Sequence, residues 1–101
     1  KEALLTFATN YNLEVLEGNK VIEIKNSGIN KGVAAAHWLS KEDWDFILAI
    51  GDDWTDEYLF AALPEKAYTI KIGTAPSKAR YHLKSVDDVR RLLKRLNKQH
   101  F

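Results

Sequence analysis

Residues 46–73 read "FILAIGDDWTDEYLFAALPEKAYTIKIG", and this stretch decides the fold. It opens with five apolar residues that do not alternate with polar ones, which is typical of a parallel strand covered on both faces. After the loop 51–55, residues 56–63 predict a helix that Pro64 ends, because proline cannot continue a helix. Residues 67–73 predict the next strand. Strand, helix and strand in this order predict an α/β fold with a parallel sheet.

A helix before this stretch and a short strand after it extend the pattern. Residues 30–40 ("NKGVAAAHWLS") predict a helix that Asn30 caps. Its expected inward-facing residues are Val33, Ala36 and either Trp38 or Leu39. Residues 81–83 ("YHL") indicate a third, short strand.

Residues 85–98 ("SVDDVRRLLKRLNK") predict the closing helix, and Ser85 and Asp88 are spaced as its capping box. Its expected buried stripe consists of Val89, Leu92, Leu93 and Leu96. The predicted parallel strands make a very small sheet whose edges would lie bare. We therefore expect the chain to be part of a domain, and its start at Lys1 rather than methionine suggests the same.

The segment before residue 30 has a different pattern. Residues 2–9 carry apolar side chains at near-helical spacing and predict a short helix. Residues 13–17 and 20–25 alternate between apolar and polar, and Gly18-Asn19 joins them, which predicts a β-hairpin. This hairpin is expected to belong to another layer.

Composition excludes several classes of protein. The chain has 101 residues and a net charge of +1, so charge gives no reason to expect nucleic acid or an anionic membrane as partner. It has no cysteine, which excludes a disulfide framework and a thiolate metal site. Because no apolar run approaches membrane-spanning length, we expect a cytoplasmic protein.

Three acidic residues, Asp52, Asp53 and Asp56, follow the first strand of this stretch directly. Ligands of open α/β sheets bind beyond the carboxyl ends of the strands. Carboxylates this close repel each other unless a cation lies between them, and Mg²⁺ suits carboxylates that leave room for water. We therefore predict a magnesium site poised for a phosphate. The alternative is that Asp52 and Asp56 merely cap the next helix while Asp53 is solvated.

The second constellation is "GINKG", residues 28–32. Lys31 enters the first turn of a helix whose amino end would face a phosphate, and we expect its amine near the three carboxylates. A lysine there would neutralise charge on phosphoryl oxygens. Taken alone the signal is weak, because most lysines in a first turn are simply solvated.

Two similar patterns are set aside. "DDxxD" also occurs in isoprenoid-handling enzymes, but there it lies within a helix of an all-helical protein. "DWD", residues 43–45, resembles a paired-aspartate nucleophile motif, but it precedes its strand. We interpret it as a solvated turn at the amino end of the sheet, with Trp44 packed nearby.

A lysine at the start of one helix, followed some twenty residues later by an apolar strand and G-D-D-x-x-D, resembles the back half of haloacid dehalogenase superfamily phosphatases. Over roughly residues 20–96 the chain is similar to the C-terminal part of trehalose-6-phosphate phosphatases, including those fused to trehalose-phosphate synthases. The resemblance implies a Rossmannoid core. Residues 1–26 would be the end of the cap subdomain and residues 27–101 the C-terminal half of the core.

The resemblance also implies roles. Asp52 and Asp56 would be the Mg²⁺ ligands, Asp52 directly, and Asp53 a catalytic residue. Asp53 and Asp56 would hold the ion's waters or orient Lys31. Lys31 would steady the phosphate of trehalose 6-phosphate and the aspartyl-phosphate intermediate.

Glu23 and Lys25 match positions that hold sugar hydroxyls in these enzymes, and Asn30 is also expected to bind the substrate. The family often has proline after the lysine, where this chain has Asn26, so the crossing from cap to core is expected to differ.

The resemblance also exposes an absence. No D-x-D follows an apolar strand in this chain, so the nucleophile of covalent catalysis is missing. We expect a C-terminal phosphatase fragment that is inactive alone and needs the rest of its domain. The alternatives are a non-catalytic module beside a synthase domain and, with a poorer fit, a two-component receiver domain.

Overall fold

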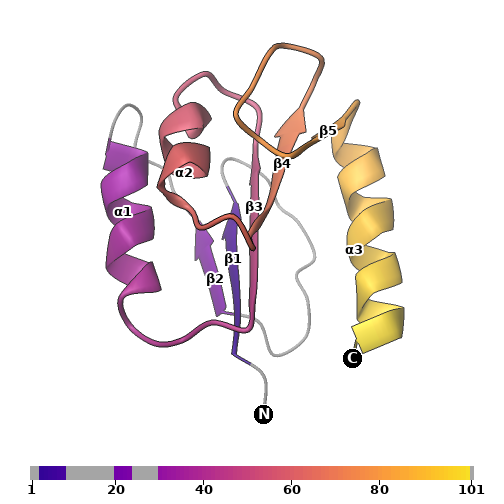
Figure 1. The fold of residues 1–101 in the computed structure, drawn as a ribbon. Coiled ribbons are helices and arrows are strands. Elements are labelled where there is room, and N and C mark those ends of the chain that lie inside the picture. Colours follow the sequence, from indigo (N-terminus) through magenta and orange to yellow (C-terminus); the bar gives the residue numbers. More distant parts are fainter. Residues whose placement is uncertain (1–2, 9–19, 24–29, 101) are drawn as a thin grey trace.

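The computed structural model describes residues 3–8, 20–23 and 30–100, which form five strands and three helices (Figure 1). In chain order these are β1 (Leu4–Ala8), β2 (Lys20–Glu23), α1 (Asn30–Leu39), β3 (Phe46–Gly51), α2 (Asp56–Ala62), β4 (Tyr68–Ile72), β5 (Tyr81–Leu83) and α3 (Val86–His100). The predicted elements from residue 30 onward are confirmed. In particular, α2 ends just before Pro64, with Leu63 as its C-cap.

The five strands form one sheet in the order β2-β1-β3-β4-β5, and every neighbouring pair is parallel. In the register, Phe7 lies opposite Ala49, and Ile50 lies opposite Ile70. Because all strands run the same way, their carboxyl ends meet at one edge, at the top of Figure 1. The predicted α/β fold with a parallel sheet is confirmed.

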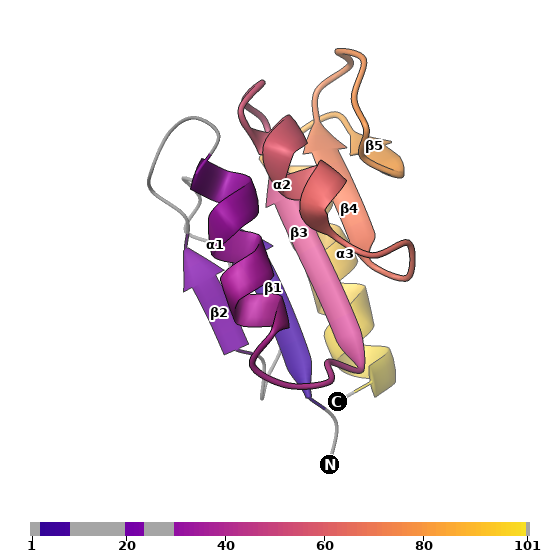
Figure 2. The ribbon, with the colours of Figure 1, turned by 60° about the vertical axis from the view of Figure 1, so that its left-hand side comes forward.

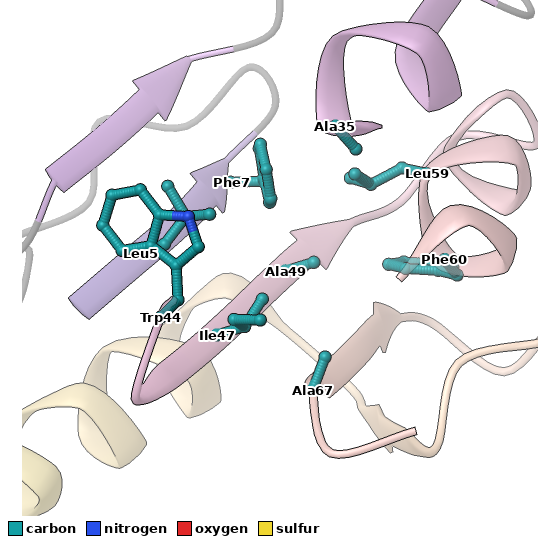
Figure 3. Packing of buried hydrophobic residues seen from close by; sticks show 9 residues of the cluster. All are labelled: Leu5, Phe7, Ala35, Trp44, Ile47, Ala49, Leu59, Phe60 and Ala67. Carbon is teal, nitrogen blue, oxygen red and sulfur yellow. The ribbon is translucent and has the colours of Figure 1, made fainter. Parts of the chain in front are cut away.

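Helices cover both faces of the sheet. α1 and α2 lie on one face and α3 lies on the other (Figures 1 and 2). Ile47 and Ala49 of β3 pack into the cluster under α1 and α2, which Figure 3 shows with Trp44 at the amino end of the strand. Leu48 and Ile50 pack into a second cluster with α3. Burial on both sides explains why residues 46–50 show no alternation.

The helix predicted over residues 2–9 is wrong, because residues 4–8 form β1. β1 lies between β2 and β3, and all five of its residues are buried. A strand in the middle of a parallel sheet is apolar on both faces, so its apolar residues carry no period of two. A run of this kind matches helical spacing by chance, and long-range pairing decides the outcome.

β2 also joins the core sheet, in parallel with β1. The first arm of the predicted hairpin, residues 13–17, lies outside the described residues. So does the cap boundary expected near residue 26. Ile22 packs against the cluster under α1 and α2, so this part of β2 contributes to the core.

The inward face predicted for α1 is wrong in part. Val33 is 69% exposed and Ala36 is also exposed, whereas Lys31 and Ala35 are buried. Trp38 is partly buried, which continues the spacing of residues 31 and 35 along one helix face. The buried amine of Lys31 sets the rotation of the helix, and a pattern of apolar residues alone does not contain that information.

The turn before β3 behaves as predicted. Asp43 and Asp45 are exposed and Trp44 is buried at the amino end of β3. Of the buried stripe predicted for the last helix, Val89 and Leu93 are buried and Leu92 is partly buried, whereas the side chain of Leu96 lies outside the described residues. The Ser85 hydroxyl accepts a hydrogen bond from the Asp88 N–H, as a cap should. Within the described part of the chain, no helix has the length and apolar character needed to cross a membrane.

Candidate functional site at the carboxyl edge of the sheet

A buried ion pair joins the first turns of α1 and α2. The Lys31 Nζ lies 2.7 Å from Asp56 Oδ1, and the two side chains are 3% and 0% exposed. The other oxygen of Asp56, Oδ2, accepts a hydrogen bond from the Asp53 N–H at 2.9 Å. The structure therefore brings together three of the residues that the sequence predicted as a site.

Two glycines make this approach possible. A Cβ on Gly51 would overlap the Asp56 side chain, so only a residue without one lets Asp56 fold back over the end of β3. A Cβ on Gly32 would lie 3.1 Å from the Tyr58 carbonyl oxygen, so a side chain at this position would limit how closely α1 and α2 approach. The glycine of the GDD motif thus serves the placement of Asp56.

The helix termini give the two charges opposite local energies. Asp56 lies in the first turn of α2, where the helix dipole stabilises negative charge. Lys31 lies in the first turn of α1, where the same dipole disfavours positive charge. Local helix stability therefore does not account for Lys31 at this position, and its pairing with Asp56 does.

The three carboxylates are not gathered around one point. Asp52 and Asp53 are exposed, whereas Asp56 is buried and bound to Lys31. Among the residues that the structure describes, no group of three or more His, Cys, Asp and Glu side chains could hold a metal ion. The expectation that all three lie around the Lys31 amine holds for Asp56 alone.

A second lysine of the site, Lys71 on β4, was missed in the sequence. Lys71 is 4% exposed, and its Nζ donates to the backbone carbonyls of Asp52 at 3.1 Å and Asp53 at 3.3 Å. It also lies 3.7 Å from Glu57 Oε2. The signal was available in "YTIKIG", where a lysine interrupts a strand of mostly apolar residues.

Glu57 connects α2 to the loop after β4. One carboxylate oxygen accepts a hydrogen bond from the Ser77 hydroxyl, and the other accepts one from the Lys78 N–H, both at 2.6 Å. Ser77 and Lys78 follow the strand that carries Lys71. Residues 77 and 78 of the loop 73–80 are therefore fastened to the same edge as the acidic loop.

The predicted sugar-binding residues are only partly placed. Glu23 is the last residue of β2, so its backbone lies at the carboxyl end of that strand. Asn30 is the first residue of α1. The side chains of both lie outside the described residues, as does the whole of Lys25, and their roles stay predictions.

Trp54 and Thr55 complete the acidic loop. Trp54 is 67% exposed and meets the Tyr58 ring edge-on at 6.1 Å. Thr55 is buried, and within the described part of the chain its hydroxyl has no hydrogen-bond partner. The loop thus exposes an indole and two carboxylates to solvent, while the polar side chain of Thr55 is buried beneath them.

Proteins with an open parallel α/β sheet bind their ligands at the carboxyl edge of the sheet, and this chain has polar side chains at that edge. Comparison with known proteins identifies the family. The chain matches the family model for trehalose-phosphatase over residues 1–92. It therefore belongs to the trehalose-phosphatase family, which lies within the haloacid dehalogenase superfamily.

The similar proteins are named as trehalose-phosphate synthases, and one of them as a bifunctional synthase/phosphatase. A bifunctional trehalose-6-phosphate synthase/phosphatase of Thermoproteus tenax is 37% identical over 95 residues, covering 94% of this chain and 13% of that protein. An α,α-trehalose-phosphate synthase (UDP-forming) B of Dictyostelium discoideum is 44% identical over 98 residues, covering 93% and 12%. The probable synthase 10 (UDP-forming) of Arabidopsis thaliana is 33% identical over 109 residues, covering 92% and 13%. The chain thus spans about an eighth of these relatives. No solved structure matches it.

Proposed function

We propose that the chain is the C-terminal part of a magnesium-dependent sugar-phosphate phosphatase that hydrolyses trehalose 6-phosphate in its complete, cytoplasmic form. The family match supports the phosphatase class, and the name of the Thermoproteus tenax relative supports the substrate. The observation that carries the proposal is the buried pair of Lys31 and Asp56 beside the exposed carboxylates of Asp52 and Asp53.

Lys31 is the proposed phosphate-steadying residue. Its Nζ has three donors, and one of them meets Asp56 Oδ1 at 2.7 Å. Asp56 holds the amine at the edge where the strands end, so the position from which its other N–H groups donate is set before substrate arrives. Such preorganisation favours stabilisation of charge that develops on phosphoryl oxygens.

The acidic loop would hold magnesium, but not all three of its carboxylates would be direct ligands. Mg²⁺ usually takes one or two protein carboxylates and keeps water or phosphate oxygens as its other ligands. The exposed side chain of Asp52 would supply a direct ligand and that of Asp53 would hold the ion's water. Because Asp56 is already bound to Lys31 and to the Asp53 N–H, we assign it to positioning the lysine rather than to direct ligation. When bound, the ion would withdraw negative charge from the phosphoryl group.

The chain alone is proposed to be inactive. β1 lies beside β3, and its carboxyl end meets the site edge. The sequence after it, Thr9-Asn10-Tyr11-Asn12, contains no aspartate that would attack phosphorus. The pure chain should release no phosphate from trehalose 6-phosphate with magnesium present, and phosphate release above the level of a Lys31→Ala variant would refute this part of the proposal.

A magnesium titration followed by amide NMR tests the site without requiring activity. Magnesium should shift the signals of residues 51–57 in the wild-type chain, weakly because part of the ligand set is missing. Asp52→Asn should abolish these shifts. Asp43→Asn serves as a matched control, because Asp43 is an exposed aspartate at the opposite edge. Equal shifts in the Asp52 variant and the wild type would exclude a specific site.

A second candidate function is a non-catalytic module that supports a neighbouring synthase domain. The names of the Dictyostelium and Arabidopsis relatives mention a synthase and no phosphatase, which favours this candidate. The two candidates differ in the whole gene product. A phosphatase requires an aspartate nucleophile motif and releases phosphate from trehalose 6-phosphate, whereas a supporting module does neither. In both, the partners are the rest of the phosphatase domain and a synthase domain.

A further inference from the structure

One peptide group of the acidic loop is held from both sides by buried charges. The carbonyl of Asp52 accepts a hydrogen bond from Lys71 Nζ, and the N–H of Asp53 donates to Asp56 Oδ2. Both atoms belong to the peptide plane between residues 52 and 53. Lys71 also binds the next carbonyl, that of Asp53. The backbone directions on both sides of Asp53 are therefore fixed.

Burial of the charged side chain of Lys71 in the sheet is energetically unfavourable. Its side chain is 5% exposed, and removing an ammonium group from water costs several kcal/mol unless partners compensate. Among the described residues, the nearest carboxylate oxygen is Glu57 Oε2, which lies 3.7 Å away, beyond hydrogen-bond distance. The hydrogen bonds of the amine go to two backbone carbonyls of one loop. An apolar residue of similar length would fill the same volume without this cost.

In the described part of the chain, the partners of Lys71 belong to the site edge. Asp52 and Asp53 carry the exposed carboxylates, and Glu57 fastens Ser77 and Lys78 of the next loop. The lysine thus lies where β4, the acidic loop and the loop 73–80 meet. A residue placed only for packing would have no reason to direct its charge at this junction.

We propose that Lys71 is a positioning residue, which fixes the peptide planes of residues 52–54 and thereby the direction in which the Asp52 and Asp53 carboxylates face. The inference rests on the proposed function, because the direction of these carboxylates affects function only when they bind a cation. It predicts that loss of the Lys71 amine loosens the loop while the fold is retained.

The test compares Lys71→Met, which keeps length and removes donors, with Lys71→Arg, which keeps charge and donors. Lys66→Met is a matched control, because the Lys66 Nζ donates to the backbone carbonyl of Trp44 at 2.8 Å at the opposite edge. The first readout is amide hydrogen exchange without metal. Exchange at the Asp53 N–H should be about tenfold faster in the Met variant, the effect of one lost charged hydrogen bond. The Arg and Lys66 variants should resemble the wild type.

The second readout is the magnesium titration of the same variants. The Met variant should bind magnesium roughly tenfold more weakly, and the Arg variant should recover most of the affinity. Stability measured by urea should stay constant or rise in the Met variant, since a buried charge is removed. A merely structural lysine would show the opposite combination, with lower stability and an unchanged loop.

The outcomes separate the inference from the proposed function. If the wild type shows no magnesium response but the Met variant exchanges faster at Asp53, the proposed metal site fails and the positioning role stands. Unchanged exchange and unchanged magnesium binding in the Met variant overturn the positioning role. Should the Met variant not fold, Lys71→Leu, which also lacks donors, replaces it and is judged by the same two readouts against Lys71→Arg.

Discussion

The Lys31 amine and the Asp56 carboxylate meet at 2.7 Å in a fully buried ion pair, although 25 residues separate them in the sequence. The pair connects the first turn of α1 to the first turn of α2 on the same face of the sheet. It lies where β3 ends, because Gly51 leaves room for Asp56 above the strand terminus. One contact therefore sets the relative position of two helices and of the acidic loop.

Breaking this pair should destabilise the chain strongly. Lys31→Met leaves the Asp56 carboxylate buried with the Asp53 N–H as a remaining partner, and loss of one member of a buried pair costs about 3–5 kcal/mol. The double variant Lys31→Met/Asp56→Leu removes both charges and should regain much of the loss. Urea unfolding monitored by circular dichroism measures each free energy of unfolding.

An exposed ion pair provides the control for this cycle. Arg91 and Asp88 of α3 lie 2.6 Å apart, but Arg91 is 72% exposed. Arg91→Met should change the free energy of unfolding by less than about 1 kcal/mol. If Lys31→Met costs no more than Arg91→Met, the buried pair does not hold α1 and α2 together.

Gly51→Ala should disturb the site through overlap rather than through backbone conformation. The new Cβ would occupy the position of the Asp56 side chain, and overpacking of this kind costs about 1–3 kcal/mol. Amide signals of residues 52–57 should shift widely. Gly73→Ala is the contrasting variant, because Gly73 has φ +111° but a Cβ added there would meet no atom within 4 Å. It should lower stability and leave those signals in place, and the reverse pattern would contradict the role of Gly51.

The strands and helices after residue 30 were predictable because each carries a local signal. The run 46–50 predicted a strand buried on both faces, Pro64 predicted the end of α2, and Ser85 predicted the start of α3. β1 was not predictable in this way. Its five buried residues acquire their conformation from β2 and β3 on either side, and those contacts are long-range.

The candidate site was predictable in its residues but not in its arrangement. The spacing placed Lys31 and Asp56 at one edge, yet nothing in it showed that Asp56 would turn inward while Asp52 and Asp53 stay exposed. That division follows from Gly51 and from the amine of Lys71, which binds backbone atoms. A sequence motif records side-chain identities and carries no information on such backbone contacts.

The three tryptophan indoles should report on different parts of the chain. The Trp44 indole N–H donates to the Trp38 carbonyl at 3.0 Å and the residue is 7% exposed, so its hydrogen exchange should be the slowest of the three. Trp54 is 67% exposed and lies between Asp53 and Thr55, so it should exchange fastest and respond first to magnesium. Two-dimensional NMR of the indole region measures both. A protected Trp54 or a magnesium response at Trp44 would contradict this assignment.

Arg80 should stabilise the segment that precedes β4 without affecting the site. Its Nη1 donates to the carbonyls of Glu65 and Ala67, both at 3.1 Å, and its guanidinium lies 5.3 Å from the ring centroids of Tyr68 and Tyr81. A lysine cannot reproduce the planar contacts with both rings, so Arg80→Lys should cost about 1 kcal/mol of stability in urea unfolding.

The matched control for Arg80 is Arg90→Lys, because Arg90 is half-exposed and pairs with Asp87 one helical turn away. It should change stability by less than about 0.5 kcal/mol. Since Arg80 precedes β5 and contacts the starts of β4 and β5, the magnesium response of residues 51–57 should persist in Arg80→Lys. Loss of that response at unchanged stability would show that Arg80 and the acidic loop are coupled, and would contradict the separation between them.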